Sequence, residues 1–132
     1  MAGSEARQRL LFTVFRGLLV LLTVLSFGQA LFAGQFLSGD GTWLAPHKVN
    51  GTAVIGTAMI LLVGGAVLIR LLKGPFWPLV LVAALFAAQW FQIKSGLDRQ
   101  LALHIPLGVA MVALPLLGLV MSFRPSAGAR RQ

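Results

Sequence analysis

Four long apolar runs constrain the fold of this chain more than any other feature of its sequence. They cover residues 10–37, 49–69, 77–93 and 101–123. A helix needs about 20 apolar residues to cross a bilayer, so each run is predicted to be a transmembrane helix. The short connections between the runs favour antiparallel neighbours in an up-and-down bundle. We therefore expect one all-α integral membrane domain over residues 1–132, built as a four-helix bundle.

The composition agrees with a membrane protein. Hydrophobic residues make up 58% of the chain and charged residues 11%, whereas a soluble domain carries about 25% charged residues. The sequence contains no cysteine, which excludes a disulfide scaffold, a Cys-ligated cluster and a Cys nucleophile. The first apolar run is too long for the core of a cleaved signal peptide, so we expect it to be retained as a helix.

The basic residues indicate how the chain is oriented. The net charge is +8, but the basic residues lie between apolar runs, which favours a topological role over nucleic-acid binding. More of them fall on the side of the termini, so the positive-inside rule places both termini in the cytoplasm, in the cytoplasmic (inner) membrane. That side holds Arg7, Arg9, Arg16, Arg70, Lys73, Arg124, Arg130 and Arg131, and the outer side holds Lys48, Lys94 and Arg99.

The two halves of the chain resemble each other when the sequence is shifted by 57 residues. Residues 35–51 then align with residues 92–108, and seven of the seventeen positions are identical. Such self-similarity predicts two tandem helix hairpins, residues 10–73 and 74–123, related by a pseudo-twofold axis along the membrane normal. The identical pairs are Gln35 and Gln92, Ser38 and Ser95, Gly39 and Gly96, Leu44 and Leu101, Ala45 and Ala102, His47 and His104, and Gly51 and Gly108.

The only two histidines, His47 and His104, form one of these pairs. They begin the second and fourth helices, which are diagonal in a bundle of this kind. Adjacent helix axes lie about 8–10 Å apart, so the diagonal axes should lie roughly 11–14 Å apart. Gly51 and Gly108 follow the histidines by four residues, and they should leave room on the same helix face for a flat macrocycle. We therefore predict that His47 and His104 ligate a haem b lined by these glycines.

Further polar residues on the outer side are candidate haem contacts. Lys48, Lys94 and Arg99 would pair with the propionates, and Gln35 and Gln92 would hydrogen-bond the imidazoles or the cofactor edge. Alternatives are open for each group. The basic residues could be exposed loop charges, the glutamines could hold helices together, and the histidines could be structural.

The segments around the histidines resemble a known family. Residues 46–51 (Pro-His-Lys-Val-Asn-Gly) and 103–108 (Leu-His-Ile-Pro-Leu-Gly) place histidines as in one four-helix half of haem A synthase, and the layout is similar to that of small bacterial four-span membrane proteins. The resemblance implies haem ligation by His47 and His104. This chain is one half-length unit, however, and residues 42–46 hold no acidic residue, so the oxygenating activity of that enzyme is not carried over.

The sequence predicts no catalytic constellation. Its acidic residues, Glu5, Asp40 and Asp98, all lie in loops or tails, and zinc would want three or four protein ligands. Two histidine ligands would fill both axial positions of a haem, which favours electron transfer or haem handling over oxygen chemistry. The expected partners are the lipid bilayer and a quinone or membrane redox complex, and not nucleic acid.

Two other functions stay open from the sequence alone. In the first, the protein is a non-catalytic accessory subunit of a larger membrane complex. In the second, it is a small carrier or channel, although the inner halves of the second and fourth runs offer almost no polar path. A homo-oligomer is compatible with either function.

Overall fold

A computed structural model describes residues 2–72 and 76–123, and helices are the only regular elements within them. The elements are α1 (Ala2–Leu37), the short 3₁₀ helix η1 (Gly41–Trp43), α2 (Leu44–Leu72), α3 (Trp77–Leu97) and α4 (Leu101–Ser122). Within these residues four helices are long and apolar enough to cross a membrane. The predicted all-α, four-helix architecture is therefore confirmed, while the predicted boundary between the hairpins, at residues 73 and 74, lies outside the described residues.

The helices extend beyond the apolar runs that predicted them. An apolar segment must satisfy its own peptide groups, which makes it helical, but polar residues can continue the helix into water. Thus α1 begins at Ala2 rather than at residue 10, and α3 ends at Leu97 rather than at residue 93. At the start of α1, Arg9 and Glu5 form an exposed pair one turn apart, at 3.6 Å.

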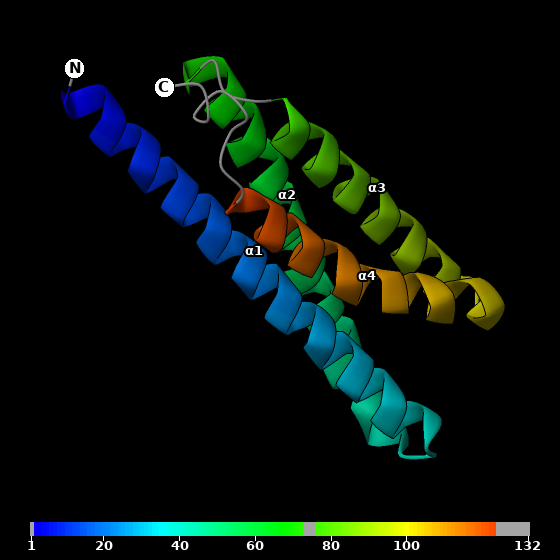
Figure 1. Cartoon of the computed structure of the whole chain (residues 1–132). Coiled ribbons are helices and arrows are strands. Elements are labelled where there is room, and N and C mark those ends of the chain that lie inside the picture. The colour runs from blue at the N-terminus through cyan, green and yellow to red at the C-terminus, as the bar shows by residue number, and fades with distance from the viewer. Residues whose placement is uncertain (1, 73–75, 124–132) are drawn as a thin grey trace.

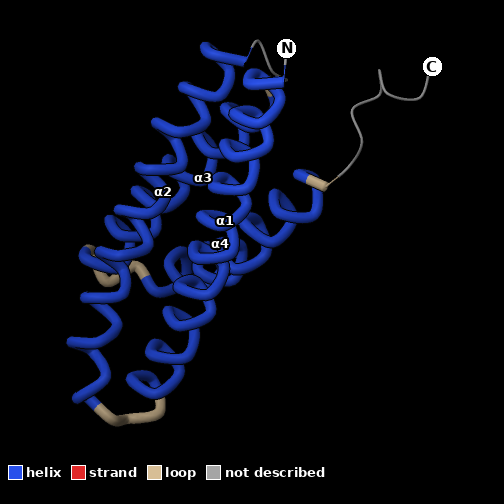
Figure 2. The backbone as a smooth tube through the Cα atoms, turned by 90° about the vertical axis from the view of Figure 1, so that its left-hand side faces the viewer, coloured by secondary structure: helices blue, strands red, loops and turns tan. Residues whose placement is uncertain are grey.

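The four helices form a closed ring. Each helix packs against two others in the order α1–α2–α3–α4 and back to α1 (Figure 1). Within the described residues α1 and α3 are therefore diagonal, as are α2 and α4, as the sequence predicted. We call the end of the bundle that contains residues 38–43 and 98–100 the hairpin end, and the opposite end the terminal end. Figure 2 shows that the α1–α2 connection lies farther out than the α3–α4 connection.

Both hairpins turn through the same type of helix end, a Schellman motif. The residue after the helix adopts a left-handed backbone: Gly39 after α1, with φ 104°, and Arg99 after α3, with φ 56°. Glycine adopts this conformation without steric cost, whereas arginine does not. The bonds that define the motif run from Gly39 N to Phe36 O and from Asp40 N to Gln35 O, and from Arg99 N to Gly96 O and from Gln100 N to Ser95 O.

The buried faces reveal the register of the repeat. In the even helices the buried residues correspond at the predicted offset of 57, but in the odd helices they correspond at 63. The first hairpin is thus six residues longer than the second. The matched buried residues are Val54, Ala58, Leu61 and Gly65 of α2 with Met111, Pro115, Gly118 and Ser122 of α4, and Phe15, Leu19, Leu22 and Ser26 of α1 with Pro78, Val82, Leu85 and Gln89 of α3.

A uniform shift of 57 residues is therefore wrong for the odd helices. Gly39 follows the end of α1, whereas Gly96 lies within α3, so these two identical residues are not structurally equivalent. The same holds for the identities at Ser38 and Gln35. An ungapped alignment cannot place six extra residues, so it matched residues at different depths in the two hairpins.

At the terminal end, Arg16 of α1 joins the last turn of α4. Its Nη2 donates to the backbone oxygen of Ser122 at 2.6 Å, its Nε lies 3.3 Å from Ser122 Oγ, and its guanidinium lies 4.2 Å from the centre of the Phe123 ring. Arg16 therefore satisfies a carbonyl that the end of α4 leaves without a helical partner.

Candidate functional site

The two histidines meet inside the hairpin end of the bundle. His47 and His104 are each the fourth residue of α2 and α4, respectively, and both side chains are half-buried. Their ring centroids lie 6.1 Å apart, with 71° between the ring planes. Because α2 and α4 are diagonal, this proximity requires both imidazoles to reach inward across the bundle. The structure thus brings together the two residues predicted as metal ligands.

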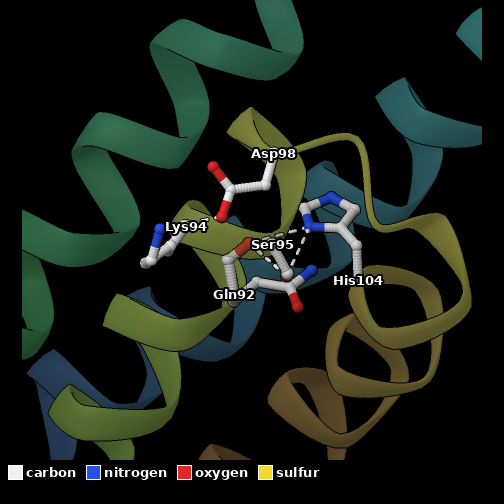
Figure 3. Close-up of polar contacts among 5 residues, drawn as sticks. All are labelled: Gln92, Lys94, Ser95, Asp98 and His104. Atoms are coloured by element: carbon white, nitrogen blue, oxygen red, sulfur yellow. Dashed lines mark hydrogen bonds and ion pairs between the residues drawn. The ribbon is translucent and has the colours of Figure 1, made fainter.

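His104 is fixed by α3. Its Nδ1 lies 2.8 Å from the backbone oxygen of Gln92 and 3.4 Å from Ser95 Oγ (Figure 3). A carbonyl oxygen can only accept, so Nδ1 carries the hydrogen, and in the neutral ring Nε2 keeps its lone pair. The ring also lies directly on Gly96, where a Cβ would come within 2.7 Å of Cε1. His104 is therefore held in the tautomer that offers Nε2 to a metal.

His47 has a looser environment. Its Nδ1 is buried and forms no hydrogen bond with the described residues. The backbone of Gln29 lies beside the ring, in the place that Gln92 takes beside His104, but the contact falls short of a hydrogen bond. The first half of the site therefore reproduces the second only in part.

Two glutamine side chains cover the glycines one turn beyond the histidines. A Cβ on Gly51 would lie 3.0 Å from Nε2 of Gln29, and a Cβ on Gly108 would lie 3.0 Å from Nε2 of Gln92. In this structure the amides therefore take up the space predicted beside these glycines. Haem contact by Gly51 and Gly108 stays a prediction.

Gln29, not Gln35, is the structural counterpart of Gln92, in agreement with the offset of 63 in the odd helices. Gln35 is exposed near the end of α1, and its contact with a cofactor stays a prediction. Gln29 precedes His47 by 18 residues, whereas Gln92 precedes His104 by 12. The sequence prediction missed Gln29 because it allowed only equal spacings, and a comparison that tolerated unequal connections would have paired the two glutamines.

Asn50 makes the two halves unequal. Its Nδ2 donates to Gln29 Oε1 at 3.0 Å and to the backbone oxygen of Leu25 at 2.8 Å. The corresponding residue of α4 is Leu107, which has no polar group to offer. Oε1 of Gln92 is accordingly buried without a hydrogen-bond partner among the described residues. The amide of Gln29 is thus anchored, and that of Gln92 is not.

The predicted propionate partners are all exposed. Lys48 and Arg99 form no ion pair within the described part of the chain, whereas Lys94 Nζ lies 2.8 Å from Asp98 Oδ2. Both members of that pair lie on the side away from the His104 ring (Figure 3). Lys48 and Arg99 are therefore better placed than Lys94 to accept a new anionic partner.

Two histidines alone suit a metal that is already bound by a cofactor better than a metal held by protein ligands only. No group of three or more His, Cys, Asp or Glu side chains converges within the described residues, which disfavours a protein-held zinc site. Two metal–imidazole bonds of about 2.0–2.1 Å would hold two nitrogens about 4 Å apart. The 6.1 Å between ring centroids is compatible with that spacing, so the two histidines could hold one metal between them.

A scan of the chain against protein-family models and searches of curated proteins and of solved structures found no match.

Proposed function

We propose that the protein binds one haem b with His47 and His104 as axial ligands. The observation that carries this proposal is the approach of the two rings to 6.1 Å from diagonal helices, with Nε2 of His104 left available by the bond from Nδ1 to Gln92 O at 2.8 Å. Metal-ligating histidines commonly donate their other nitrogen to a backbone carbonyl in this way. The resemblance to one half of haem A synthase supports the same assignment.

The proposal places the site near the outer face of the cytoplasmic membrane, with both termini inside. Basic residues support this orientation: Arg7, Arg9, Arg16 and Arg70 lie toward the terminal end, and positive charge favours the cytoplasmic side. The hairpin end would then face outward and carry the haem. Four further basic residues counted for this orientation, Lys73, Arg124, Arg130 and Arg131, lie outside the described residues.

A haem held by both His47 and His104 would supply one-electron redox chemistry, because both protein ligands are engaged in holding the group. In this proposal His104 is positioned by Gln92 and Ser95, and Lys48 and Arg99 attract the propionates. The protein would transfer electrons to or from a quinone or a membrane redox complex at the outer face, or would hold haem for another protein. It would do so without a catalytic side chain of its own.

Haem titration of the detergent-purified apoprotein tests this function. We expect one haem per chain, with the absorbance of a six-coordinate b-type centre. His47→Ala and His104→Ala should each weaken binding by at least about tenfold, since each removes one iron ligand. Thr52→Ala is the control, because this exposed side chain bonds only the backbone oxygen of Lys48, and it should bind haem as the wild type does.

Equal haem affinity in the wild type and in the His47→Ala/His104→Ala double variant would refute the ligand assignment. If the monodisperse wild-type protein binds no haem, the histidines are structural and the accessory-subunit function is favoured. Co-purification with a partner in mild detergent would then be the next measurement.

A further inference from the structure

We infer that the two histidines are unequal ligands: His104 anchors the haem, and His47 is the exchangeable ligand, on whose side the site takes a small neutral molecule such as carbon monoxide. This inference rests on the proposed haem site and specifies which of its faces opens. It follows from a difference between the two halves of the repeat that is present in the protein before any haem binds.

The anchoring of His104 depends on three neighbouring residues of α3. Gln92 O accepts from Nδ1 at 2.8 Å, Ser95 Oγ lies 3.4 Å from the same nitrogen, and Gly96 lets the ring lie against the helix backbone. Partners of this kind fix a ligand's orientation and raise its basicity, and losing one typically costs about 10–100-fold in metal affinity. His104 is therefore oriented for ligation in the apoprotein.

The first half of the repeat lacks two of these three residues. At the offset of 63, Ser95 corresponds to Phe32 and Gly96 corresponds to Ala33. Phe32 offers no hydroxyl group, and its ring stacks on Trp43 instead, with centroids 5.6 Å apart. Ala33 has a Cβ in the place where His104 lies against Gly96. Of the three, His47 keeps only the backbone of Gln29 beside its ring, and its Nδ1 forms no hydrogen bond with the described residues.

The exchange step requires no electron or proton transfer. His47 would give up its place to the incoming neutral ligand, so that one bond to the metal is exchanged for another and neither the oxidation state nor the total charge changes. His104 would stay in place because its ring is held by Gln92 and Ser95.

The inequality of the two rings is measurable without haem. The chain contains only two histidines, so ¹⁵N-histidine NMR of the apoprotein gives two sets of ring resonances, which His47→Gln assigns. We expect His104 to be a single tautomer with hydrogen on Nδ1 and His47 to be a mixture of tautomers. Two identical tautomer patterns would overturn the inference, whatever the outcome of the haem titration.

Carbon monoxide titration of the dithionite-reduced haem protein tests which ligand exchanges. We expect the wild type to bind carbon monoxide. Ala33→Gly, alone and together with Phe32→Ser, recreates the surroundings of His104 around His47 and should lower that affinity by about tenfold or more. The matched control is Gly34→Ala, since a Cβ at Gly34 would meet nothing within 4 Å, and it should leave the affinity unchanged.

Haem retention provides a second test of the same inequality. His104→Ala should lose at least about tenfold more haem affinity than His47→Ala, because it removes the oriented ligand. Equal losses, a larger loss for His47→Ala, or a haem-loaded wild type that takes up no carbon monoxide would each overturn the inference while leaving the haem site intact. Absence of haem from the wild type would instead refute the proposed function.

Discussion

Nη2 of Arg16 lies 2.6 Å from the backbone oxygen of Ser122, and this bond joins the first helix to the last at the terminal end of the bundle. Ser122 is buried and Arg16 is half-buried, so the hydrogen bond is partly shielded from water. Hydrogen bonds from a charged donor contribute about 1.5–3 kcal/mol, more than neutral ones. A half-buried charged side chain thus joins α1 to α4 at this end of the bundle.

Replacing Arg16 should open this contact. Arg16→Gln is expected to lower the free energy of unfolding by about 1.5–3 kcal/mol, measured by reversible unfolding in detergent. Arg9→Gln is the control, since the exposed pair of Arg9 with Glu5 at 3.6 Å contributes little. Equal effects of the two substitutions would show that the Ser122 contact does not hold the bundle together.

The left-handed backbone of Arg99, after the end of α3, predicts that a glycine at this position stabilises the fold. Arg99 has φ 56°, a conformation that costs a non-glycine residue about 1–2 kcal/mol. Arg99→Gly should therefore raise the free energy of unfolding by about 1 kcal/mol, while Gly39→Ala, at φ 104° in the other hairpin, should lower it. A loss of stability in Arg99→Gly would mean that the arginine side chain contributes more than its backbone strain costs.

Gln89 carries a buried amide nitrogen that has no partner among the described residues. Its side chain is 4% exposed, and its Nε2 forms no hydrogen bond with the described residues. An unsatisfied buried donor costs about 1–3 kcal/mol, so Gln89→Met, which preserves length and removes the polar group, should raise the thermal stability of the apoprotein. Exposed Gln35→Met should change it little. Destabilisation by Gln89→Met would indicate that the amide has a bound partner.

Asp40 makes the tip of the first hairpin sensitive to acid. The hydroxyl and then the backbone N–H of Thr42 donate to its carboxylate and lower the pKa of Asp40 from its ordinary value of 3.8. The folded pKa is the lower one, so the stabilisation is complete above the unfolded pKa and is lost as the pH falls through the folded value.

Hydrogen exchange at the Thr42 amide reports this titration. Its protection factor should be constant near neutral pH and should fall in acid below about pH 4. Asp40→Asn should remove that pH dependence while leaving the protection of helix α2 unchanged. A protection factor that falls equally in Asp40→Asn would assign the acid sensitivity to another group.

The fold was largely predictable because long apolar runs leave few choices of backbone structure. Apolar runs near 20 residues must be helices, and short connections must make neighbours antiparallel. The meeting of His47 and His104 followed from the same reasoning, since their helices had to be diagonal. Polar residues such as Glu5 did not end the helices, however, so the helices are longer than the apolar runs that predicted them.

The rotation of each helix could not be predicted from the sequence. A helix that is apolar on every side does not reveal which face is buried. The buried residues of α1 between Phe15 and Ser26, and their counterparts in α3, could therefore be identified only in the structure. That match exposed the six extra residues of the first hairpin. The role of Gln29 depended on it, because Gln29 lies in the odd helix α1, which an equal spacing misaligns, and the role of Asn50 follows from its bond to Gln29.

The visible spectrum of the protein, purified in detergent from haem-supplied cells, tests the central claim most directly. The oxidised and the dithionite-reduced forms are recorded on the same monodisperse sample. Ligation by His47 and His104 predicts a Soret band and sharp reduced α and β bands, at one haem per chain, that are lost in the His47→Ala/His104→Ala double variant. A flat wild-type spectrum, or one that the double variant retains, would contradict the proposed haem site.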